Sequence, residues 1–116
     1  MAEAALFIGW GMPARGREKA GLEVFNESMQ YYGRLQQEGQ IERFDVAILM
    51  PHGSLGGFAL LRGTAQQIDS VRRSKEFRTL VDRVTLRVDQ VEISDAYVDE
   101  GLAELMGEYQ DEVGKL

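Results

Sequence analysis

The run Ala4-Ala5-Leu6-Phe7-Ile8-Gly9-Trp10 has apolar side chains at odd and even positions alike. Successive side chains of a strand point to opposite faces, so this run predicts a strand that is apolar on both faces. Residues 44–50 and 58–61 show the same property. Such strands need cover on two sides. Because a chain of 116 residues has few helices to spare for a second layer, we expect a second copy of the chain to supply the other cover.

The composition is that of one soluble globular domain, with 44% hydrophobic and 28% charged residues. The absence of cysteine excludes disulfides, thiolate metal sites and a cysteine nucleophile. No apolar run approaches the length that spans a bilayer, and the N-terminus lacks the basic start of a signal peptide. We therefore expect a cytoplasmic protein without a membrane partner.

Charge is unevenly distributed along the chain. Residues 1–88 carry twelve Lys and Arg against ten Asp and Glu, whereas residues 89–116 carry nine acids against Lys115 alone. Residues 72–87 hold six basic side chains and two acidic ones. Two interpretations stay open: these are two solvated helix faces of opposite sign, or the acidic tail docks on the basic segment of its own subunit or of a partner.

Periodicity and capping signals predict the order β-α-β-β-α-β followed by a terminal helix. Thr64 with Gln67 forms a capping-box signature, and Ser74 is a second helix start. A phase shift near Asp89-Gln90 predicts a bulge in the last strand. The expected elements are strands over 4–10, 41–50, 58–62 and 86–93 and helices over 17–37, 64–73, 74–84 and 102–113.

This order predicts a ferredoxin-like α+β sandwich: a four-stranded antiparallel sheet with both main helices on one face and its first and third strands in the centre. We expect one such domain over residues 1–98 and an acidic amphipathic helix over 99–116. The helix-free face of the sheet must then be covered.

Several short motifs resemble those of the dimeric α+β barrel superfamily, in an uncharacterised bacterial group near the YCII-related and antibiotic-monooxygenase-like proteins. They are FIGWG at 7–11, GRE at 16–18, GQI at 39–41, GGFALLRG at 56–63 and SKEFR at 74–78. The resemblance implies a homodimer formed through the sheets, with a cavity between sheet and helices. The early histidine–aspartate pair of YCII-type members is missing here, because His52 is the only histidine.

Two residues are candidates for catalysis. His52, in the loop between two strands, could carry a proton, or it could be an ordinary surface residue. Arg62 could offer its planar guanidinium to a carboxylate or enolate oxygen, or it could form a buried ion pair with Asp45. No second histidine or cysteine exists to join His52 at a metal, so we predict no metal site.

Four further residues are candidates for ligand binding. Trp10 and Tyr32 could form a pocket wall, although core packing is the preferred interpretation of both, because aromatic residues dominate cores. Arg17 and Glu18 stand in a family-like motif that would place them at the cavity mouth. The spacing Gly11 to Gly16 resembles a phosphate loop, but Arg17 and Glu18 replace the lysine and the hydroxyl that such a loop needs.

The sequence thus predicts a homodimer that binds a small organic molecule without a cofactor. Whether it is an enzyme stays open; cofactor-free oxidation or isomerisation would fit. One alternative is a structural or interaction protein whose cavity is filled by its own side chains. Another is an RNA-recognition motif, which shares the element order. Leu60 stands where that motif needs a stacking aromatic, and the acidic balance opposes phosphate binding, so we expect no nucleic acid partner.

Overall fold

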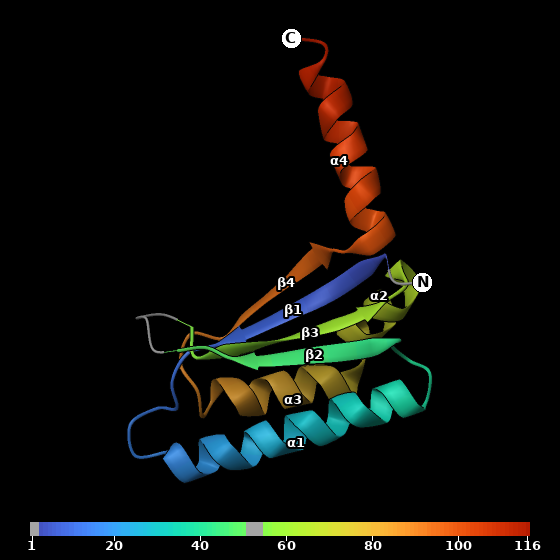
Figure 1. The fold of residues 1–116 in the computed structure, drawn as a ribbon. Helices are drawn as coiled ribbons and strands as arrows, with labels where there is room; N and C mark the ends of the chain where they lie inside the picture. Colours follow the sequence, from blue (N-terminus) through green and yellow to red (C-terminus); the bar gives the residue numbers. More distant parts are fainter. Residues whose placement is uncertain (1–2, 51–54) are drawn as a thin grey trace.

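The computed structural model describes residues 3–50 and 55–116. It shows an antiparallel sheet with helices packed on one of its faces and a final helix that extends away from the opposite face (Figure 1). The elements in chain order are β1 (Ala4–Trp10), α1 (Glu18–Gln37), β2 (Arg43–Ile48), β3 (Gly57–Gly63), α2 (Ala65–Arg73), α3 (Lys75–Thr85), β4 (Glu92–Tyr97) and α4 (Asp99–Val113).

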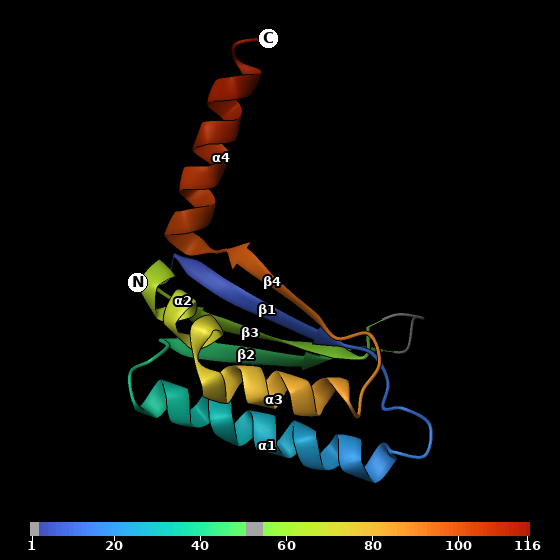
Figure 2. The ribbon, with the colours of Figure 1, turned by 180° about the vertical axis from the view of Figure 1, so that it is seen from behind.

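The sheet has the strand order β2-β3-β1-β4, and every neighbouring pair is antiparallel. The prediction that the first and third strands lie in the centre is therefore confirmed, as is the ferredoxin-like α+β fold. Phe7 lies opposite Leu60 of β3 and Ser94 of β4, so the register places these three side chains on the same face. Figures 1 and 2 show from opposite sides that α1 and α3 both lie below the sheet.

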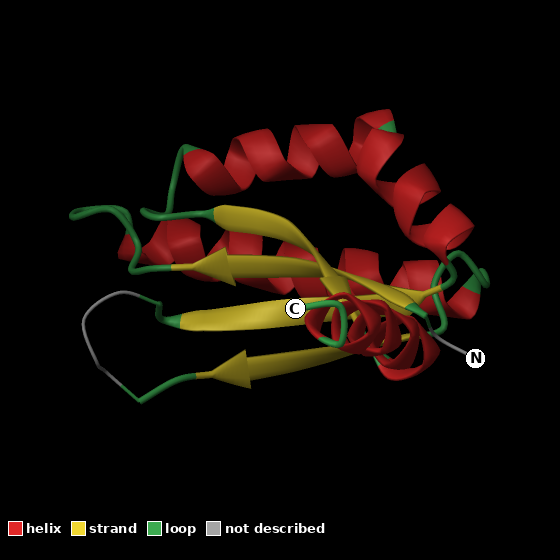
Figure 3. Ribbon diagram, turned by 90° about the horizontal axis from the view of Figure 1, so that it is seen from above, coloured by secondary structure: helices red, strands yellow, loops and turns green. Residues whose placement is uncertain are grey.

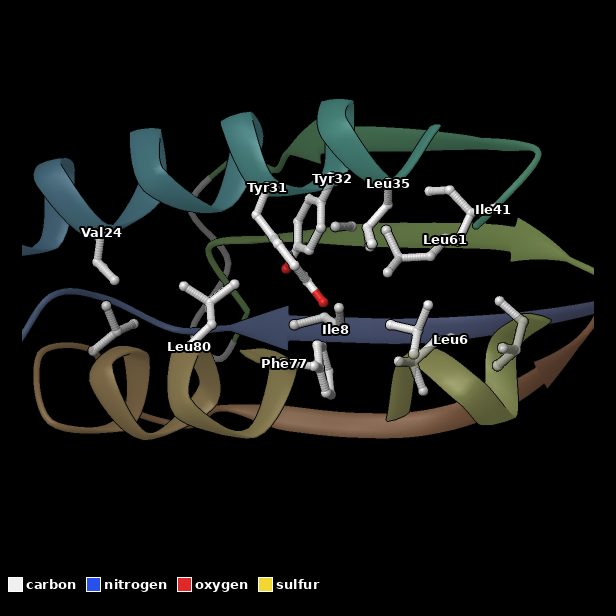
Figure 4. Close-up of a cluster of buried hydrophobic side chains, with 14 residues drawn as sticks. Leu6, Ile8, Val24, Tyr31, Tyr32, Leu35, Ile41, Leu61, Phe77 and Leu80 are labelled. Atoms are coloured by element: carbon white, nitrogen blue, oxygen red, sulfur yellow. The ribbon is translucent and has the colours of Figure 1, made fainter. Parts of the chain in front are cut away.

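The core lies between the sheet and this helix layer. Leu6 and Ile8 of β1 and Leu61 of β3 point toward the helices and are at most 5% exposed. Side chains from α1 and α3 meet them from the other side (Figure 4). The buried helical members of this cluster include Val24, Tyr31, Tyr32, Leu35, Phe77 and Leu80.

The predicted helix starts at Thr64 and Ser74 are confirmed. The Thr64 hydroxyl accepts from the Gln67 amide, and the Gln67 side chain accepts in return from the Thr64 amide. The Ser74 hydroxyl donates to the carbonyl of Val71 and accepts from the amide of Phe77. Ser74 therefore both ends α2 and begins α3, which turns the chain along the sheet.

The prediction for the last strand was wrong in position. β4 begins at Glu92, whereas the residues before it pair with the loop after β1: Asp89 donates its amide to the carbonyl of Met12, and Val88 forms an isolated bridge with Pro13. Gln90, at φ 57°, turns the chain into the strand. Of the apolar residues at 86–91, Val88 and Val91 pack with the buried cluster, whereas Leu86 is exposed. The true strand is an edge strand with exposed polar residues, which hydrophobic alternation does not reveal.

The helix-free face of the sheet has an apolar centre and a polar border. Phe7 and Phe58 stack there with ring centroids 5.5 Å apart, beside the half-buried Leu60. Arg43 and Glu92, on the two edge strands, lie on the same face. Seen from above in Figure 3, no helix lies flat over this face; α4 rises from one end of it toward the viewer.

Gly57, the first residue of β3, lies close to two neighbours because it has no side chain. A Cβ atom at this position would stand 2.6 Å from the Ala47 carbonyl oxygen and 2.8 Å from the Trp10 ring. We expect Gly57→Ala to lower the free energy of unfolding by about 1–3 kcal/mol, because backbone or ring must move to make room. Urea denaturation followed by circular dichroism measures this.

The matched control is Gly33→Ala in α1, where a Cβ would meet nothing within 4 Å. In a helix interior this change should be neutral or stabilise by up to about 1 kcal/mol. Equal effects of the two substitutions would contradict the close approach at Gly57.

Candidate functional site

A pocket with a volume of about 370 Å³ opens between the N-terminal half of α1 and the end of the sheet. β1 ends there at Trp10, β2 ends there at Ile48, and Val84 of α3 closes one side. Its described lining residues are Trp10, Gly11, Met12, Pro13, Glu18, Gly21, Leu22, Val24, Phe25, Ser28, Met29, Tyr32, Ile48, Gly56, Val84 and Val88.

Two small buried residues of α1 line this pocket. Gly21 and Ser28 lie two helical turns apart on the face of α1 that points toward the sheet. Gly21 lets Pro13 pack closely, since a Cβ atom there would stand 3.0 Å from the Pro13 Cβ, whereas Ser28 takes less volume than a large side chain would. Ser28 also satisfies its hydroxyl internally, since it donates to the Val24 carbonyl at 2.8 Å.

The pocket is apolar, and its rim is apolar and exposed. Met12, Leu22 and Ile48 line it although they are 69%, 61% and 66% exposed. Trp10 and Phe25 meet edge to face inside, with ring centroids 5.9 Å apart. Exposed apolar groups around an apolar hollow are typical of a binding site.

Few polar side chains reach the pocket. Among its described lining residues, Trp10, Glu18, Ser28 and Tyr32 carry an indole N–H, a carboxylate or a hydroxyl. Tyr32 is 3% exposed, and burial raises the pKa of its phenol, while the Ser28 hydroxyl acts in the opposite direction. Its O–H therefore stays protonated at neutral pH and can donate a hydrogen bond.

Three of the four residues predicted to bind a ligand line this pocket: Trp10, Tyr32 and Glu18, the last of which lies exposed at its edge. Arg17 is not among the lining residues. It stands just before α1, and its Nη1 donates to the Leu86 carbonyl at 3.4 Å. This hydrogen bond links the start of α1 to the end of α3.

Arg62 lies on the other face of the sheet. Its Nε donates to Asp45 Oδ2 at 2.9 Å, and its Nη1 stands 3.8 Å from Asp99 Oδ2 at the start of α4. The ion pair with Asp45 that the sequence offered as an alternative is thus present, but it is not buried, since the Asp45 side chain is 49% exposed. Arg62 does not share the pocket with Trp10 and Tyr32. His52 lies outside the described residues.

Much of the α1 wall, including Leu22, Phe25 and Met29, was not predicted from the sequence. Phe25 and Met29 recur at helical spacing with Val24 and Tyr32, which is typical of core residues. The available signal was the small Ser28 on this apolar face, at a position where a core helix ordinarily carries a large side chain.

Comparison with solved structures shows the same fold in other proteins. A dimeric protein of unknown function with a ferredoxin-like fold from Bacteroides fragilis is 12% identical with a TM-score of 0.61, over 82% of this chain and 95% of that one. An antibiotic biosynthesis monooxygenase is 13% identical with a TM-score of 0.54, over 83% of this chain and 96% of that one. No family model and no curated protein matches the sequence.

The burial of Tyr32 predicts a pH dependence of stability. Above the ordinary tyrosine pKa of 10.0 the unfolded chain releases a proton that the folded protein keeps, so the folded state becomes less favourable as pH rises. We expect the free energy of unfolding to fall from about pH 10 upward, with Tyr32 contributing about 1.4 kcal/mol per pH unit. Denaturation series between pH 8 and 11.5 measure this slope.

Tyr32→Phe should make the slope shallower, whereas Tyr97→Phe, at a phenol that is 58% exposed, serves as the matched control. An unchanged slope in Tyr32→Phe would show that this phenol ionises as readily in the folded protein as in the unfolded chain.

Proposed function

We propose that the protein is a homodimer that binds a small, mostly apolar organic molecule in the pocket between α1 and the sheet. The observation that carries this proposal is the pocket itself: about 370 Å³, lined almost entirely by apolar side chains and rimmed by exposed ones. A volume of this size falls within the range of small-molecule sites, about 300–1,000 Å³.

The lining defines the class of ligand. Trp10 and Phe25 offer ring surfaces to a flat or aromatic group. The Tyr32 hydroxyl offers one buried donor, which suits a carbonyl or ether oxygen. Glu18 lies at the exposed edge, where an anionic ligand would be repelled. A neutral aromatic ketone or phenol has the features that these groups would recognise.

Cofactor-free oxidation, with dioxygen as the oxidant, or isomerisation is the enzymatic version of this proposal, and the monooxygenase among the structural neighbours supports considering it. Both reactions begin with removal of a proton from the substrate. Among the described lining residues, Glu18 alone carries a carboxylate, and it would be the general base. Tyr32 lies 14 residues further along α1, about 21 Å along the helix axis, so it would bind a remote part of the ligand and not the reacting atoms.

The helix-free face supports the dimer. Its centre holds Phe7, Phe58 and Leu60, and charged residues stand at its border, as in many protein interfaces. The Bacteroides fragilis protein that shares this fold is itself dimeric. Two copies packed face to face would cover the apolar centre of both sheets.

One observation favours the RNA-binding alternative. Phe7 and Phe58 lie on the open face of β1 and β3, where stacking aromatics would meet bases. Charge argues against it, since the chain carries a net charge of −6. A monomeric protein that binds single-stranded RNA would favour this alternative over the dimer.

Ligand binding can be followed through Trp10, the only tryptophan of the chain. We expect neutral aromatic ketones and phenols, titrated as a small panel, to change its fluorescence saturably. Leu22→Asp places a charge on the pocket rim and should weaken binding at least about tenfold. Leu86→Asp is the matched control, because Leu86 is 68% exposed and does not line the pocket. Unsaturable quenching by every compound would contradict the proposed site.

The dimer has its own test. Leu60→Glu places a charge at the centre of the helix-free face and should convert the dimer to a monomer, since an unpaired charge in an apolar interface is costly. Sedimentation velocity measures the mass, and the fold is checked by circular dichroism. Leu22→Asp, on the helix side, should remain dimeric. A Leu60→Glu protein that is as dimeric as the unmodified chain would show that copies meet elsewhere.

A further inference from the structure

We propose that α4 is an arm that packs its apolar stripe against the second copy of the chain, an inference that rests on the proposed face-to-face dimer. Within its own subunit α4 buries no residue. It nevertheless carries an apolar stripe at helical spacing, with Leu102, Met106, Tyr109 and Val113 between 44% and 63% exposed. A stripe of this kind on an isolated helix needs a partner surface.

The position and length of α4 point to the second copy as that partner. The helix rises from one end of the helix-free face, the same face whose apolar centre lacks cover (Figure 3). Its 15 residues span about 22 Å. Sheets packed face to face stand about 10 Å apart. In a dimer of this kind α4 must therefore extend past the partner's sheet and reach the level of the partner's helices.

The base of the arm is fixed, so its direction belongs to the fold. Asp99 adopts φ 49° at the first position of α4, and its carboxylate lies 3.8 Å from Arg62. Gly101 lies directly against the backbone of Glu3, where a Cβ atom would collide with the Glu3 carbonyl oxygen. The ion pair to Asp45 holds Arg62 in turn, so two strands position the start of the arm.

The acidic character of α4 favours contact with a basic part of the second copy. α4 contains six acidic residues and no basic one, so two α4 helices side by side would repel each other. The partner's helix layer offers the opposite sign over residues 72–87, where Arg73, Lys75 and Arg78 are exposed. The structure therefore favours contact of the acidic arm with the partner's basic helices over an α4–α4 pair.

The test compares three full-length proteins by their dimer dissociation constants. Met106→Gln with Tyr109→Gln removes the centre of the stripe and keeps helix-compatible side chains. Glu104→Asp with Asp111→Glu exchanges two exposed acids on the side of the helix opposite the stripe, leaves its charge unchanged and serves as the control. Sedimentation equilibrium at several concentrations gives the constants, and circular dichroism verifies that α4 stays folded.

We expect the stripe variant to dimerise at least about tenfold more weakly than the unmodified chain, with the control unchanged. Raising the salt concentration should weaken the unmodified dimer, because exposed opposite charges are screened. A stripe variant that dimerises as tightly as the control would overturn the arm while leaving the dimer intact. An unmodified chain that is monomeric throughout would overturn the dimer itself, and the arm with it.

Discussion

The two central strands, β1 and β3, are apolar on both faces, so both faces of the sheet need an apolar surface packed against them. β1 and β3 place Leu6, Ile8 and Leu61 on one face and Phe7, Phe58 and Leu60 on the other. The helix layer buries the first set nearly completely, whereas the second set remains half-buried in a single chain. Covering that second face with another apolar surface would release further hydrophobic free energy.

The pocket lies on the face of the sheet that the helices cover, at a place where the packing of α1 on the sheet is incomplete. Along most of α1, large side chains such as Leu35 and Tyr32 fill the space above the sheet. In the middle of α1 the small Ser28 does not, and the sheet ends beside the N-terminal half of the helix, where Pro13 packs on Gly21. The result is an apolar hollow open to solvent, in which Tyr32 provides a buried donor and Glu18 an exposed carboxylate.

The fold could be predicted because its signals are local and repeated. Two-sided apolar strands, a helical period over α1 and the caps at Thr64 and Ser74 each constrain the topology independently, and short connections leave few arrangements. β4 could not be placed this way. As a polar edge strand it owes its position to pairing with β1, and the apolar Val88 before it belongs to the pocket.

Prediction of the site was less complete, for a physical reason. Trp10 ends β1 and Glu18 begins α1, so these two motif residues lie where the strand and helix meet beside the pocket. Tyr32 belongs to none of the motifs and lines the pocket from within α1. From the sequence, the partner of Arg62 could be a ligand or Asp45. The register between β2 and β3 decides this, because it places Asp45 diagonally beside Arg62 on the same face of the sheet. A cavity depends on what side chains leave unfilled, and one sequence does not show that directly.

The proposed dimer requires contact between two helix-free faces, and this contact can be observed directly in solution. A mixture of isotope-labelled and unlabelled chains allows nuclear Overhauser effects between subunits to be observed separately. A face-to-face dimer predicts such effects from the methyl groups of Leu60 and the rings of Phe7 and Phe58 to an unlabelled subunit. Strong solvent exposure of these side chains at high protein concentration, with no effect between subunits, would contradict it.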